Sequence, residues 1–84
     1  MADTLGLLAE ARQLAHDLGY VVREEPLGEV AGGPCVVGGE RRILLNLAHA
    51  AAGQLDVLIA SLRADPRTRE QPMSRLLAAK LGGT

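Results

Sequence analysis

The sequence predicts a single α+β domain: an N-terminal helix, a three-stranded antiparallel sheet, then one long and one or two short C-terminal helices. Apolar residues recur at helical spacing near both ends of the chain. Between them lie short runs rich in Val, Ile and Leu, separated by glycine pairs. A chain of 84 residues has room for one core, so we expect one domain over residues 1–84.

The first helix is predicted over residues 4–18. Its apolar residues share one face because they recur every three or four positions: Leu7, Ala11, Leu14 and Leu18. Asp3 or Thr4 can accept hydrogen bonds from the first amides, and Gly19 is suited to the left-handed conformation that ends many helices.

Extended segments are predicted between residues 20 and 45. Residues 20–24 are rich in strand formers, and Pro26 soon afterwards lacks the N–H that a ladder requires. Residues 35–37 and 41–45 flank a Gly-Gly turn, which predicts a hairpin. Their apolar residues do not alternate with polar ones, so we expect helices or a partner to cover the second face of the sheet.

Three helical segments are predicted after the sheet. Asn46 can cap a long helix that runs to about residue 63, with an apolar stripe made of Ala51, Leu55, Leu58 and Leu62. Asp65 followed by Pro66 predicts the start of a short helical piece. Pro72 begins a final helix over residues 73–81, which can pack on its own domain or on a partner.

Composition favours self-association. There is no Phe or Trp and only one Tyr, so aliphatic side chains must build the core of an already small domain. Small domains commonly compensate with disulfides, metals or oligomerisation. The single cysteine excludes an internal disulfide, and no Cys/His cluster suits a structural zinc. We therefore expect a homodimer or higher oligomer.

Charge and hydropathy indicate which classes of partner are expected. Residues 1–30 carry six acids and two bases, whereas residues 63–84 carry five bases and two acids, and we expect these ends to neutralise each other in the fold or across a dimer. Nucleic acid is not the expected partner, because the net charge is −1 and aromatic platforms are lacking. No apolar run is long enough to span a bilayer and no secretory signal is evident, so we expect a cytoplasmic protein.

Cys35 is the first candidate for catalysis. A nucleophilic thiolate needs a nearby cation or base, which Arg41, Arg42 or His49 can supply across the hairpin or at the next helix. Its valine neighbours favour a packed strand instead. His16 and His49 are too far apart in sequence for a compact zinc ligand pair. We therefore expect no catalytic residue, metal or cofactor, with a Cys35-dependent enzyme or redox sensor as the alternative.

Two resemblances lie in the middle of the chain. The line Ile-Leu-Leu-Asn-Leu-Ala-His-Ala-Ala-Ala-Gly at residues 43–53 resembles the strand and helix of small bacterial zincin-like metallopeptidases, whose His-Glu-x-x-His helix binds zinc and activates water. His49 matches the first ligand, but Ala50 replaces the Glu and Gly53 the second His. The resemblance therefore implies the shape without the chemistry. Residues 32–45, with a Gly-Gly-x-Cys strand, are similar to short uncharacterised bacterial proteins, which implies no activity.

The predicted function is that of a non-catalytic protein-interaction or oligomerisation module that binds itself and another protein. Weak nucleic-acid binding through the basic residues 63–80 is a further alternative. The residues expected at a contact are Val36, Val37, Leu44, Leu76 and Leu77.

Overall fold

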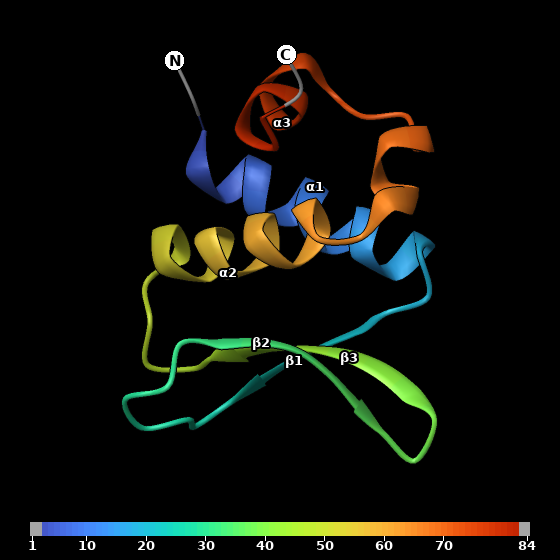
Figure 1. Cartoon of the computed structure of the whole chain (residues 1–84). Coiled ribbons are helices and arrows are strands. Elements are labelled where there is room, and N and C mark those ends of the chain that lie inside the picture. Colours follow the sequence, from blue (N-terminus) through green and yellow to red (C-terminus); the bar gives the residue numbers. More distant parts are fainter. Residues whose placement is uncertain (1–2, 83–84) are drawn as a thin grey trace.

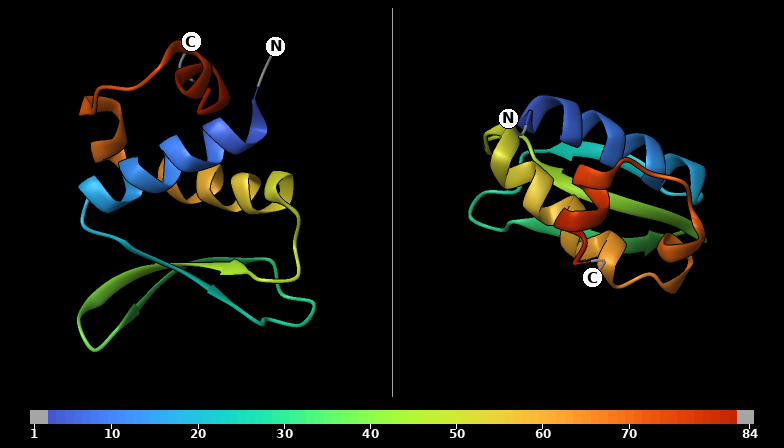
Figure 2. Two further views of the ribbon diagram at one scale, coloured as in Figure 1. Left: turned by 180° about the vertical axis from the view of Figure 1, so that it is seen from behind. Right: turned by 90° about the horizontal axis from the view of Figure 1, so that it is seen from above.

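The computed structural model describes residues 3–82 and arranges them in three layers (Figure 1). The sheet forms one layer, two helices cross it, and the C-terminal segment lies on the far side of that helix pair (Figure 2). The predicted α+β class and order of elements are confirmed. The elements are α1 (Thr4–Asp17), β1 (Val21–Glu25), β2 (Gly32–Val37), β3 (Glu40–Asn46), α2 (Ala51–Arg63), the 3₁₀ helix η1 (Pro66–Glu70) and α3 (Arg75–Lys80).

The sheet is mixed, with the strand order β1-β3-β2. The hairpin pair β2 and β3 is antiparallel, as predicted, but β1 runs parallel to β3, with Val22 opposite Ile43. The prediction of a wholly antiparallel sheet is therefore wrong at this pair. The central position gives β3, the strand with the most buried residues, a neighbour on each edge. Its direction follows from the short connection 26–31, which makes β2 run back antiparallel to β1. Because β3 pairs antiparallel with β2 and lies between the two, it is parallel to β1.

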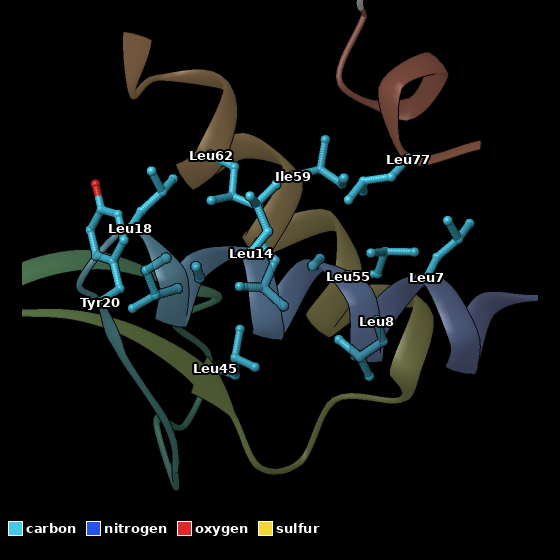
Figure 3. Close-up of a cluster of buried hydrophobic side chains, with 14 residues drawn as sticks. Leu7, Leu8, Leu14, Leu18, Tyr20, Leu45, Leu55, Ile59, Leu62 and Leu77 are labelled. Carbon is cyan, nitrogen blue, oxygen red and sulfur yellow. The ribbon is translucent and has the colours of Figure 1, made fainter. Parts of the chain in front are cut away.

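The core lies between the sheet and the helix pair and continues beneath α3 (Figure 3). Tyr20, the one aromatic residue, is buried at its edge. Aliphatic residues from β3, α2 and α3 form its centre, and the following are fully buried: Ile43, Leu45, Leu58, Leu62 and Leu77. The prediction of an aliphatic core is confirmed.

Asn46 has a different role from the predicted helix cap, because α2 begins only at Ala51. Its side chain is buried at the end of β3. The amide nitrogen donates to the backbone carbonyls of Gly28 and Val30, both at 2.9 Å, and Oδ1 accepts from the Ala48 N–H at 3.0 Å. Asn46 thus joins the loop before β2 to the turn before α2, and satisfies buried polar groups in both.

The last helix packs on its own domain and is shorter than predicted. Ser74 caps it, since its Oγ accepts a hydrogen bond from the Leu77 N–H at 3.1 Å. The Glu10 carboxylate of α1 accepts from the Ser74 N–H at 2.7 Å and from its hydroxyl at 2.6 Å. These bonds and the buried Leu77 side chain hold α3 against α1.

A matched pair of glycine substitutions tests the backbone. Gly32 has a φ of +107°, and a Cβ there would lie 2.2 Å from the Leu44 carbonyl oxygen. Gly32→Ala is expected to lower the free energy of unfolding by at least about 2 kcal/mol. At Gly53, inside α2, a Cβ would meet the His49 Cβ at an ordinary 3.4 Å, so Gly53→Ala is expected to raise it by up to about 1 kcal/mol. Urea unfolding measures the free energy of unfolding of both variants. Equal effects of the two substitutions would contradict the backbone conformations described for Gly32 and Gly53.

Candidate functional site

The sheet has one face under α1 and α2 and one face that no element of residues 3–82 covers (Figure 1). Ile43 and Leu45 point toward the helices, so the alternating Arg42 and Leu44 point the other way. Residues directly opposite in neighbouring strands share a face, and the register therefore assigns the rest. We call this surface the open face; its residues are Val21, Arg23, Glu25, Cys35, Val37, Glu40, Arg42 and Leu44.

The open face combines aliphatic side chains with charges that cancel. Val21 and Val37 are 38% and 49% exposed, and Leu44 is half-buried between the outer strands.

Each arginine on this face is paired with a glutamate two residues away on its own strand. Arg23 Nε lies 3.2 Å from Glu25 Oε2, and Arg42 Nε contacts Glu40 Oε1. The open face therefore has no net charge, and it presents apolar area without a field that would repel a second copy.

The residues predicted at a contact do not form one surface. Val37 and Leu44 lie on the open face. Val36, 69% exposed, lies at the edge of β2 and points toward the helical side, because it is paired with Arg41. Leu76 is exposed on α3, in the third layer. Leu77 is fully buried, so its prediction as an interface residue is wrong: it anchors α3 in the core.

The thiol and the histidines are placed apart. Cys35 is half-buried on the open face opposite Arg42, whose Nε is already bound to Glu40. His49 precedes α2 and lies against Gly53, on the helical side of the sheet. His16 is solvated, with 78% of its side chain exposed. Among residues 3–82, no group of three or more His, Cys, Asp or Glu is placed to hold a metal ion.

Asp65 is the centre of a polar cluster that the sequence did not reveal. Its buried carboxylate accepts from the Tyr20 hydroxyl at 2.9 Å, and from the Arg67 backbone N–H at 2.9 Å and guanidinium at 2.7 Å. Arg41 donates to the Tyr20 hydroxyl at 3.1 Å and lies 4.8 Å from the centre of its ring. The cluster therefore ties the entry to β1, the strand β3 and η1 together.

The hydrogen bonds from Arg67, assisted by the one from Tyr20, hold the pKa of the Asp65 carboxyl well below its usual range, against the opposing effect of burial. The same contact raises the pKa of Arg67. The sequence indicated only the local part of this cluster, the Asp65 cap before Pro66, which is confirmed. Tyr20 lies 45 residues away in sequence, and no local signal links the two.

Two residues of the basic C-terminal segment serve the fold. Arg63 donates to the backbone carbonyls of Lys80 at 2.8 Å and Leu81 at 3.2 Å, which satisfies the end of α3. Arg67 is bound to Asp65. Both guanidinium groups are thus committed to internal contacts, which does not favour the segment as a nucleic-acid surface.

No protein-family model, curated protein or solved structure matches this chain. The fold and the site define an α+β domain whose mixed sheet is covered on one face. The resemblances to zincin-like metallopeptidases and to short bacterial proteins stay predictions. None of the helices within residues 3–82 is long and apolar enough to cross a membrane.

The Asp65 cluster predicts a loss of stability in acid. The pKa of Asp65 is lower in the folded chain than in the unfolded one, so its contribution is present above about pH 4 and is lost as the pH falls below that value. Asp65→Asn is expected to lower the free energy of unfolding at pH 7 by about 2 kcal/mol, because charge-assisted hydrogen bonds are lost.

Urea unfolding between pH 3 and pH 7 measures both effects. Asp65→Asn should also make the free energy of unfolding less dependent on pH between pH 3 and pH 5. Asp17→Asn, at an exposed position on α1, is the matched control. A variant that retained the steep acid side would show that Asp65 is not its source.

Proposed function

We propose that this chain is a non-catalytic protein-interaction module that self-associates through the open face of its sheet. The observation that carries the proposal is that this face has aliphatic side chains and no net charge, and that no helix or strand of residues 3–82 covers it. Contact with another protein through the same face belongs to the proposal.

The thin core supports self-association. An 84-residue chain without Phe or Trp has little aliphatic area to spare, yet Val21, Val37 and part of Leu44 remain outside the core. Each square ångström of apolar surface removed from water contributes about 25 cal/mol. Covering these side chains with a second copy therefore stabilises the domain in the way that small scaffolds commonly require.

The size of the sheet sets the expected strength of the contact. Its strands have five to seven residues, which corresponds to lengths of about 17 to 24 Å. Three such strands offer less than the roughly 800 Å² per partner of a standard interface. We therefore expect a dimer that dissociates on dilution.

Cys35 supplies an internal reporter of the same contact. It is half-buried on the open face beside Arg42, so a second copy over this face would shield the thiol. Its reaction with a disulfide reagent should slow as the protein concentration rises. A thiol that reacted at one rate at all concentrations would argue against contact at this face.

A pair of leucine substitutions tests the interface. Wild-type protein is expected to shift from monomer to dimer in sedimentation experiments as its concentration rises from micromolar to millimolar. Leu44→Glu, on the open face, should remain monomeric because a charge would be placed in the contact. Leu76→Glu is the matched control, since Leu76 is 53% exposed on α3 and lies in the third layer.

Circular dichroism establishes that both variants are folded. A monomeric wild type at millimolar concentration would refute self-association. Dissociation by Leu76→Glu but not by Leu44→Glu would move the interface from the sheet to α3.

A further inference from the structure

A cavity of about 740 Å³ lies between the end of α2, η1 and α3. Two of the elements that bound the cavity, η1 and α3, lie on the other side of the helix pair from the sheet (Figure 1). Its volume falls within the roughly 300 to 1,000 Å³ that small-molecule sites occupy. The connection between η1 and α3 forms part of its wall.

The floor of the cavity is apolar and continuous with the core. Leu62 is fully buried, and Met73 and Leu81 are partly buried and pack against the same hydrophobic cluster. Leu62 lies beneath this floor, and the apolar surface open to a ligand belongs to the partly buried Met73, Ala78 and Leu81. A ligand that covered these three partly buried side chains would extend the core outward. An aliphatic chain has the required chemistry.

The polar groups of the cavity favour an anion. Arg63 and Arg69 line it, and among residues 3–82 no carboxylate lies within 4.0 Å of the Arg69 guanidinium. Asp65 is the one acid in the lining, and its charge is offset by Arg67. Arg63 is engaged with the carbonyls at the end of α3, which leaves Arg69 as the cation available to a ligand.

Hydrogen bonds at both ends of α3 position this wall of the cavity. Glu10 holds Ser74 at the start of α3, and Arg63 holds the carbonyls of Lys80 and Leu81 at its end. Because both ends of α3 are tied, a movement of the helix that closed the space would break these hydrogen bonds. Protein interiors are otherwise packed with few voids larger than a water molecule.

We infer that this cavity binds a small amphipathic anion, an aliphatic chain of several carbons that ends in a carboxylate. The chain lies on the floor formed by Met73, Ala78 and Leu81, and the carboxylate is bound by Arg69. The inference goes beyond the proposed self-association and does not depend on it, because η1 and α3, which bound the cavity, lie on the other side of the helix pair from the sheet.

Octanoate is the probe. Titration into the wild-type protein, followed by calorimetry and by amide NMR, should give saturable binding with a dissociation constant of about 1 mM or below. The largest amide shifts should fall at Met73, Ala78 and Leu81. Lengthening the probe from butyrate to octanoate should tighten binding about fourfold per methylene, since each buried methylene contributes a constant increment.

A matched pair of arginine substitutions separates the two halves of the site. Arg69→Gln should weaken octanoate binding about tenfold and leave the binding of neutral octanol unchanged. Arg75→Gln is the control, because Arg75 is an exposed arginine of α3 that does not line the cavity. Ala78→Phe, which fills the cavity, should abolish binding of both probes.

Several outcomes would overturn the inference. They are the absence of saturable binding up to several millimolar octanoate, equal effects of the Arg69 and Arg75 substitutions, and amide shifts confined to the open face. The last outcome would show that the sheet, and not the cavity, takes up apolar ligands. Amide spectra of each variant without ligand establish that it is folded.

Discussion

The position of β3 is the constraint on which the rest of the structure depends. In a chain without Phe or Trp, the side chains of Ile43 and Leu45 must be removed from water completely, and both are fully buried. This requires a neighbouring strand on each edge of β3 and two helices above it. That requirement is met because β1 and β2 pair with the two edges of β3, and the loop from β1 to β2 passes the end of β3. The helix pair lies above β3. The open face is its consequence, since Leu44 must then point away from the helices.

Local order was predictable wherever a single segment determines it. The periodicity of α1 and the Gly-Gly turn between β2 and β3 depend on residues close in sequence, and both predictions are confirmed. Strand order depends on which strand gains most from a central position, and this compares segments far apart. Asn46 shows the same limit. Its side chain suits a helix cap, but here it binds the carbonyls of a loop 16 to 18 residues earlier.

The candidate site was predictable only in part. Which side chains are exposed depends on the face to which each strand residue points and on the rotation of the short helix α3 about its axis. Val37 and Leu44 were named as contact residues from their apolar character, and the register places both on the open face. Leu76 and Leu77 are adjacent in a helix of six residues, too short for periodicity to separate the buried one from the exposed one. The Asp65 cluster joins residues that are distant in sequence, so only its helix cap was visible.

Under the proposed self-association, the charge pairs on the open face allow that face to be exposed in a monomer and covered in a dimer. A fully aliphatic face would make the isolated chain prone to aggregation, whereas a fully charged one would exclude a second copy. Arg23 with Glu25 and Arg42 with Glu40 keep the face compatible with water at no net charge, and exposed ion pairs of this kind contribute little stability that association would have to replace. In the proposed dimer, the attraction would come from the aliphatic residues between these charge pairs. Because the apolar area is small and the charge pairs stay compatible with water, we expect the proposed association at this face to be reversible.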